Sequence, residues 1–385
     1  MAISALVGTI IGVGMFELPY AASQAGVGIA LFYLLVFGIV TTFVHLLYLE
    51  VVMRTKGKHR LIGYVRVYLG KKWEIVTFIQ GLISLWGTLL IYTILTGKFF
   101  YLLLQRGIGL SLPYNTEIFL GAAFFIISAA IVLKGKRAIN EQELWFSLPL
   151  GALIVGIFIK ALTSPSFAIE SFVSPRSFSW ILPYGVTLFA LSGSSIIPSL
   201  KEIIDPKTEK GKRLNIPLVV VLGTLIPTVL YMLFVIGVIG VSKGATSPDA
   251  LAGLEPFFGK TIIFLGAALG IIAIYTSFLP VAEELYRTFV DDYHKKKSIA
   301  ALFTFLVPLF FYVFQVFDFT LLISVVGTLM GGYLGILVVL LFWKMQKKEQ
   351  ANFPISPLIS SVIGLFIISV FIFASLYVLV STMTR

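Results

Sequence analysis

The feature that most constrains this sequence is a series of long apolar segments separated by short stretches rich in charge, proline or glycine. We mark eleven, near residues 2–24, 27–53, 73–104, 116–133, 144–163, 179–200, 214–241, 261–290, 298–316, 318–343 and 357–381. A helix of about 20 apolar residues crosses the hydrocarbon layer of a membrane, and within lipid the helix also satisfies its own backbone polar groups. The sequence therefore predicts an all-α integral membrane protein with eleven membrane-spanning helices.

Composition excludes several other classes of protein. Only 12% of the residues are charged, about half the share of an average soluble domain, and the alternating pattern of a membrane β-barrel is absent. The net charge of +11 resides in short loops rather than on one helix face, so we expect no nucleic acid partner. Cysteine is absent, which excludes disulfides and thiolate metal sites. The chain opens directly into an apolar stretch, so we expect no cleavable signal peptide.

The distribution of basic residues predicts the orientation in the membrane. Of the 29 Lys and Arg residues, 22 lie in the loops that follow the second, fourth, sixth, eighth and tenth segments. Basic loops stay in the cytoplasm, so we expect the amino terminus inside, the carboxyl terminus outside, and the protein in the cell membrane.

The first five segments and the next five occupy chain lengths that are nearly equal. Because five is odd, the second set must cross the membrane inverted relative to the first, as in many secondary transporters. We therefore expect a first repeat at residues 1–163, a second at residues 164–343, and a loop with one extra helix at residues 344–385. Length symmetry alone is weak support for this division.

Two apolar segments carry helix-breaking residues at corresponding positions. In the first, Gly8, Gly12 and Gly14 precede Pro19; in the sixth, a cluster of serines around Gly193 precedes a proline. Glycine and proline weaken helices, so we expect the first and sixth helices to be broken. Glycines at such spacing also serve close helix packing, and packing alone remains an alternative reading.

A broken helix in a membrane offers polar backbone groups to a ligand. The start of the half-helix after a break carries free N–H groups and partial positive charge, which suit a carboxylate. The end of the half-helix before it offers carbonyl oxygens that suit an ammonium group or a sodium ion. Two facing breaks therefore predict a site for a zwitterion such as an amino acid.

The two motifs resemble those of a known family. GTIIGVGMFELPYAASQAG is similar to the first helix of amino acid permeases in the amino acid–polyamine–organocation superfamily, and YGVTLFALSGSSIIPSLKEIIDP resembles the sixth helix of the amino acid/auxin permease branch. The resemblance implies the five-plus-five inverted repeat of the leucine transporter and transport by alternating access. It also implies a set of substrate-binding residues, of which Tyr92 is the loosest match: Gly12, Val13, Gly14, Tyr92, Phe189, Ala190, Ser192, Gly193 and Ser194.

The eighth segment carries a candidate ion site. Ala273, Thr276 and Ser277 share one helical face and would present one carbonyl and two hydroxyl oxygens, the donor type that hard cations prefer. The carbonyls of Gly8 and Ile11 complete a set that resembles the conserved sodium site of the leucine-transporter fold. The two hydroxyls could instead bond to carbonyls of their own helix.

Other sequence features bear on ion coupling. The family's second sodium site uses an Asn where this chain has Met15, so we expect one sodium site. Lys160 lies too near the outer surface to replace that ion, as a Lys does in proton-coupled relatives. Glu17 lies beside the first break, where an acid is costly and a functional candidate by default, as a proton carrier or a gate. His45 is a weaker candidate for either role.

Two other classes of protein are alternatives to a transporter. A membrane enzyme would need a metal cluster, a nucleophile with its base, or a phosphate loop; no such motif appears, and we expect no enzyme activity and no cofactor apart from the coupling ion. A sensor on the same fold would bind an amino acid without carrying it, and fold alone does not separate the two. We expect an amino acid and the lipid bilayer as partners, without an obligatory protein partner.

Overall fold

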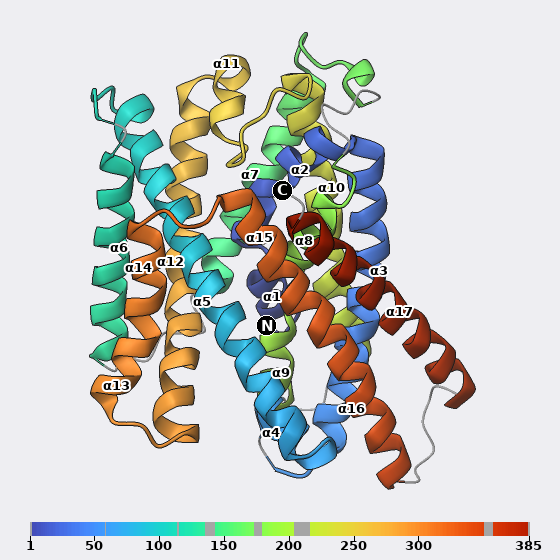
Figure 1. The fold of residues 1–385 in the computed structure, drawn as a ribbon. Helices are drawn as coiled ribbons and strands as arrows, with labels where there is room; N and C mark the ends of the chain where they lie inside the picture. Colours follow the sequence, from blue (N-terminus) through green and yellow to red (C-terminus); the bar gives the residue numbers. More distant parts are fainter. Residues whose placement is uncertain are drawn as a thin grey trace.

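The computed structural model describes residues 2–57, 59–113, 115–134, 143–172, 179–203, 216–349 and 357–383. It is a bundle of helices, most of which run roughly along one direction (Figure 1). The first half of the chain contains α1 (Ala2–Ile10), η1 (Val13–Glu17), α2 (Leu18–Ala25), α3 (Val27–Arg54), α4 (Leu61–Tyr68), α5 (Lys71–Leu102), η2 (Leu103–Gly107), α6 (Thr116–Leu133) and α7 (Glu143–Leu162).

The second half repeats this mixture of long helices and short turns. It contains η3 (Ile169–Phe172), α8 (Leu182–Ala190), η4 (Ser194–Ile196), α9 (Ile197–Ile203), α10 (Ile216–Ser242), η5 (Ala252–Leu254), α11 (Glu255–Phe258), α12 (Lys260–Arg287), η6 (Thr288–Asp292), α13 (Lys297–Ala301), η7 (Leu302–Leu306), α14 (Val307–Val313), α15 (Phe319–Gly327), η8 (Thr328–Gly332), α16 (Tyr333–Glu349) and α17 (Pro357–Met383).

Each of the eleven expected segments contains helix. Within the described residues, six helices are long and apolar enough to cross a membrane, and the bent pair formed by α1 with η1 and α2 makes a seventh. Shorter apolar helices occupy residues 148–162, 297–313 and 361–373. The protein therefore has an all-helical, multi-span fold. The eleven crossings, the inverted repeat and the orientation in the membrane stay predictions.

The outside of the bundle is apolar, as a lipid-facing surface requires. Phe119 is 74% exposed and Phe32 62% exposed, and both lie on long apolar helices. A soluble protein rarely exposes so much contiguous apolar surface. The interior is equally apolar, with Leu6, Phe16 and Phe278 fully buried, so these helices are hydrophobic on all sides.

The broken helices lie at the centre of the bundle. Helix α10 packs against α1, α2, α3 and α7, and α8 packs against α2, α3 and α15. The contact between α8 and α15 is a backbone contact: a Cβ atom on Gly185 would lie 2.0 Å from the Ser324 carbonyl oxygen, and one on Gly327 would lie 1.9 Å from the Gly185 carbonyl oxygen. These glycines bring the first half of the sixth segment directly against the tenth.

The end of the bundle that carries α4, which the basic loops predict to be cytoplasmic, is tied together by charged side chains. Lys201 on α9 donates to the carbonyls of Val52 and Thr55, at 3.0 Å each, at the end of α3. A cation at the end of a helix is favoured by the helix dipole. Within single helices at this end, Glu50 and Glu283 form ion pairs with Arg54 and Arg287, at 2.5 and 2.7 Å.

Parts of the predicted basic loops lie outside the described residues. These are Lys58, residues 135–137 and residues 204–213; Arg176 and Arg385, which the prediction places on the opposite side, also lie outside the described residues.

Candidate functional site

The first segment breaks where the glycines predict it. Helix α1 ends at Ile10, the Ile11 N–H donates to the Val7 carbonyl at 2.8 Å, and Gly12 is extended with φ −146° and ψ −153°. The chain then resumes as the 3₁₀ turn η1 and as α2, and the two parts are bent by 46°. The carbonyl end of α1 and the N–H end of η1 therefore meet in the middle of the bundle.

The sixth segment breaks in the same way. Helix α8 ends at Ala190, and the N–H groups of Leu191 and Ser192 donate to the carbonyls of Thr187 and Phe189, at 2.9 and 3.2 Å. Gly193 separates this end from the 3₁₀ turn η4, after which α9 begins. Both predicted breaks are present, and each places the end of a short helix inside the protein.

Two of the predicted glycines allow the breaks to touch. A Cβ atom on Gly14 would lie 2.5 Å from the Ala190 Cα atom, and one on Gly193 would lie 2.6 Å from Cγ1 of Ile10. Each break thus packs a glycine against the last residue of the opposite half-helix. Gly12 differs, because its Cβ atom would meet only the Ile10 carbonyl oxygen, at 3.9 Å. Close packing is therefore part of what Gly14 and Gly193 do.

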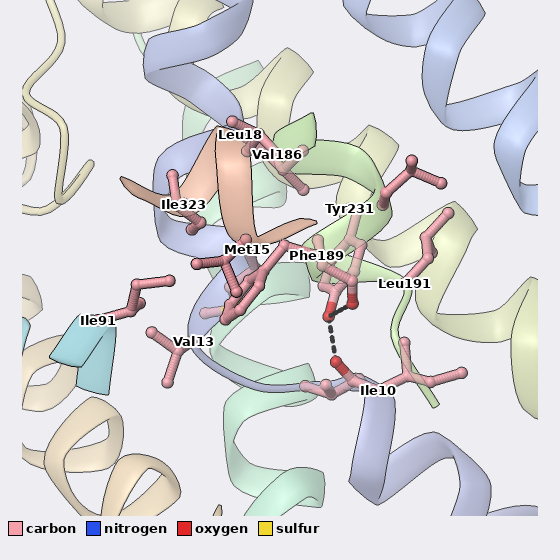
Figure 2. Close-up of a cluster of buried hydrophobic side chains, with 14 of the residues drawn as sticks. Ile10, Val13, Met15, Leu18, Ile91, Val186, Phe189, Leu191, Tyr231 and Ile323 are labelled. Carbon is pink, nitrogen blue, oxygen red and sulfur yellow. Dashed lines mark hydrogen bonds between the residues drawn. The ribbon is translucent and has the colours of Figure 1, made fainter. Parts of the chain in front are cut away.

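A residue that the sequence did not single out joins the same two helix ends. Tyr231 on α10 is fully buried, and its hydroxyl lies 2.5 Å from the carbonyl oxygen of Ile10 and 3.3 Å from that of Ala190. Figure 2 shows the hydroxyl between the two breaks. Tyr231 is one of 16 tyrosines and belongs to no motif, so nothing in the sequence marks it.

Apolar side chains surround the place where the two breaks meet. Val13 and Met15 come from η1, Phe189 from α8, Ile91 from α5 and Ile323 from α15 (Figure 2). All are buried, with exposed fractions of at most 7%. Helix α5 thus presents Ile91 here, while its predicted neighbour Tyr92 is partly buried and lies near Tyr231.

Glu17 lies at the end of η1 and is fully buried. Its Oε1 atom accepts a hydrogen bond of 2.6 Å from the Thr320 hydroxyl on α15. Among the described residues, none donates a hydrogen bond to its Oε2 atom. Lys98 is an electrostatic neighbour, with its Nζ atom 5.1 Å from the centre of the Phe319 ring. The predicted intramembrane acid is thus enclosed and only partly satisfied.

The predicted sodium ligands lie on α1 and α12. Helix α12 packs against η1, where a Cβ atom on Gly270 would lie 3.3 Å from the Phe16 ring. The Thr276 hydroxyl donates to the Ala273 carbonyl at 3.0 Å, which is the local bond anticipated as an alternative. Gly8 and Ile11 are buried, and Ser277 is partly buried.

Histidine and acidic residues supply no competing metal centre. In the described part of the chain, no three His, Cys, Asp or Glu side chains gather as metal ligands. His45 is buried, with Nδ1 3.0 Å from the Thr224 hydroxyl.

Different spaces adjoin the two breaks. A cavity of about 20 Å³, large enough for a water molecule, lies behind the sixth-segment break, and its polar lining comes from Thr41, His45, Ser192 and Ser194. Beside the first-segment break lies a groove of about 400 Å³ whose lining is entirely apolar and includes Val7 and Ile11.

Comparison with known proteins places these features in a family. The sequence profile of the tryptophan/tyrosine permease family matches residues 1–380. The chain is 26% identical over 370 residues to the tyrosine-specific transport system 1 of Haemophilus influenzae, covering 90% of this chain and 88% of that protein.

Two further relatives are named for the transport of glutamine and of tryptophan. Over 310 residues the chain is 23% identical to glutamine transporter 2 of Aliivibrio fischeri, covering 79% of this chain and 78% of that protein. Over 340 residues it is 25% identical to the tryptophan-specific transport protein of Pseudomonas aeruginosa, covering 79% and 76%.

The fold is also similar to a solved structure. MhsT in complex with L-phenylalanine superposes with a TM-score of 0.70 at 16% identity, over 99% of this chain and 97% of that one. This likeness concerns the fold alone and supports the leucine-transporter fold that the two helix motifs imply.

Proposed function

Because the chain belongs to the tryptophan/tyrosine permease family, we propose that it carries an amino acid with a large apolar or aromatic side chain across the membrane by alternating access. It is a multi-pass protein of the cell membrane, and its relatives are amino acid transporters rather than enzymes. The substrate class, the coupled ion and the transport mechanism are proposals.

The meeting of the two breaks supports a zwitterionic substrate. The last carbonyls of α1 and α8 lie within reach of one hydroxyl, that of Tyr231, so two negative helix ends converge on one region. The ammonium group of the substrate would bind at the end of α8, through carbonyls between Phe189 and Ser194. Its carboxylate would bind the backbone around Gly12, Val13 and Gly14, where η1 begins.

The apolar lining supports a large uncharged side chain. Val13, Met15, Phe189, Ile91 and Ile323 enclose the region between the breaks. A charged side chain would lose its hydration there without gaining a partner. Aromatic side chains bury large areas and pack well against such walls, which agrees with the family to which the chain belongs.

We propose a single sodium ion as the coupled cargo, bound by the carbonyls of Gly8, Ile11 and Ala273 and the hydroxyls of Thr276 and Ser277. Oxygen donors suit a hard cation, and α12 packs against η1. The ion would replace the local bond between Thr276 and Ala273.

Proton coupling through Glu17 is the second candidate. The full burial of this acid and the unpartnered Oε2 atom among the described residues favour it, because removal of water favours the neutral form of a carboxyl group. A sensor that binds the same substrate without carrying it is a further alternative.

Uptake into proteoliposomes tests these proposals directly. Purified protein is reconstituted, and labelled tyrosine, tryptophan and glutamine are offered under a sodium gradient or a proton gradient. We expect sodium-driven accumulation of the aromatic substrates, with glutamine at least about tenfold slower. Binding without uptake under either gradient would identify a sensor, and accumulation driven only by protons would move the coupling to Glu17.

A threonine substitution tests the ion site. Thr276→Ala removes one proposed ligand, and we expect it to abolish sodium-stimulated uptake. The matched control is Thr288→Ala, which removes a hydroxyl that bonds to the Glu284 carbonyl at 2.8 Å near the end of the same helix region. Unchanged sodium dependence in Thr276→Ala excludes the proposed ion site.

A further inference from the structure

Tyr231 brings one hydroxyl group to two helix ends from different halves of the chain. Its side chain projects from α10 and is fully buried. The hydroxyl oxygen lies 2.5 Å from the Ile10 carbonyl oxygen and 3.3 Å from the Ala190 carbonyl oxygen. Ile10 is the last residue of α1 and Ala190 the last residue of α8, so the same group reaches both breaks.

The two carbonyl oxygens compete for the single proton of the Tyr231 hydroxyl. A tyrosine hydroxyl has one proton to donate, and two carbonyls lie within its reach. The shorter distance gives the stronger bond to Ile10, while the contact with Ala190 is at the long end of the hydrogen-bond range. The Ala190 carbonyl is therefore only weakly satisfied, which leaves it able to accept a stronger donor.

The two helix ends also touch each other beside the hydroxyl. Gly14 packs on Ala190, and Gly193 packs on Ile10, with would-be Cβ contacts of 2.5 and 2.6 Å. Ile10 directly precedes Ile11, whose carbonyl belongs to the proposed sodium site. A shift in the bond that Tyr231 makes to Ile10 therefore acts on a neighbour of a proposed ion ligand.

We propose that Tyr231 is the positioning residue that links substrate binding at the end of α8 to ion binding at the end of α1. The inference rests on the proposed function. A substrate ammonium group bound to the Ala190 carbonyl releases the Tyr231 hydroxyl to donate fully to Ile10. That bond fixes the end of α1, so the adjacent carbonyls are held in place for the ion. By linkage, sodium raises the affinity for substrate by the same factor.

The experiment measures that linkage factor. Binding of labelled tyrosine to purified protein is measured with and without sodium, and sodium binding is measured with and without tyrosine. In the unmodified protein we expect sodium to raise tyrosine affinity within the usual range for coupled sites, about 5- to 150-fold. In Tyr231→Phe, which keeps the ring and removes the hydroxyl, we expect the factor to fall to about twofold or less.

Tyr312→Phe is the matched control. The Tyr312 hydroxyl also donates to a backbone carbonyl, that of Glu117, at 3.2 Å, but it lies on α14, away from the breaks. This variant should keep the full linkage factor. A purely structural role for Tyr231 would lower both affinities together and leave their dependence on each other unchanged. Thermal unfolding of each variant verifies that it is folded under the assay conditions.

The outcomes separate the inference from the function on which it rests. If Tyr231→Phe keeps the linkage factor of the unmodified protein, Tyr231 does not couple the sites, although the transporter proposal stands. If the unmodified protein binds tyrosine without any effect of sodium, the sodium proposal and this inference both fail. If the factor falls in Tyr231→Phe and persists in Tyr312→Phe, the coupling role is supported.

Discussion

The breaks in the first and sixth segments share a design but differ in their surroundings. Around the first, Val13 and Met15 are buried, and the adjoining groove of about 400 Å³ is apolar. Around the second, Ser192 and Ser194 are partly exposed, and the adjoining cavity of about 20 Å³ has a mixed lining, in which Thr41, His45, Ser192 and Ser194 stand among apolar side chains. An acid, Glu17, follows the first break, whereas Pro198 occupies the matching position five residues after Gly193.

This difference indicates how the same structural feature, a broken helix, can suit two kinds of chemical group. Both breaks expose backbone polarity inside the bundle, and each needs a glycine to pack against the opposite half-helix. The first break is followed by apolar side chains and an acid, whereas hydroxyl groups join the apolar side chains around the second. Substitutions at the two breaks distinguish whether backbone contact or side-chain chemistry dominates at each of them.

Gly14→Ala should have the largest effect. Its Cβ atom would lie 2.5 Å from the Ala190 Cα atom, so backbone must move and the breaks must separate. Overpacking costs about 1–3 kcal/mol, and each 1.4 kcal/mol is about tenfold in affinity, so we expect tyrosine to bind about 10- to 100-fold more weakly. Equilibrium binding measures this. Gly12→Ala is the steric control, since its Cβ atom has room; equal effects of the two variants would contradict the packing role.

Gly193→Ala should weaken tyrosine binding less, by about three- to tenfold. Here the added Cβ atom meets the Ile10 side chain, at 2.6 Å from Cγ1 and 2.9 Å from Cδ1, and side-chain atoms move more easily than backbone. Combining Gly193→Ala with Ile10→Ala removes both the Cγ1 and the Cδ1 atoms and should restore part of the affinity in the same binding assay. A double variant no better than the single one would show that the Ile10 side chain is not the obstacle.

Glu17→Gln should change sodium-driven uptake by less than about threefold. The amide oxygen of Gln can still accept the 2.6 Å hydrogen bond from Thr320, and the proposed ion site does not use this side chain. Uptake into proteoliposomes under each gradient provides the measurement, with Thr320→Val as the variant that removes the donor. Loss of all gradient-driven uptake in Glu17→Gln, with tyrosine binding retained, would favour proton coupling.

Ser192→Ala should have the smallest effect, within about twofold on tyrosine affinity. The proposed ammonium ligands at this break are backbone carbonyls, which the substitution keeps, and the Ser192 N–H still donates to the Phe189 carbonyl. Isothermal titration with tyrosine measures the change. A loss of more than tenfold would show that the hydroxyl itself binds the substrate, and the sixth segment would then rely on side-chain chemistry.

The sequence predicts the breaks well because their causes are local. Gly12, Gly14 and Gly193 interrupt apolar periodicity, and composition alone predicts a membrane bundle. The role of Tyr231 is not local: its hydroxyl meets residues 221 and 41 positions away, and such a contact leaves no periodic signal.

The contact between α8 and α15 has a mechanical consequence. Gly185 and Gly327 bring the two backbones so close that an added Cβ atom would lie 2.0 Å or less from a carbonyl oxygen across the contact. Because backbone lies directly against backbone at these glycines, a change of side-chain rotamer cannot let one helix shift past the other. A displacement of α8 would therefore move α15 with it, and would change the position of Thr320, on α15, relative to Glu17, which accepts its hydrogen bond.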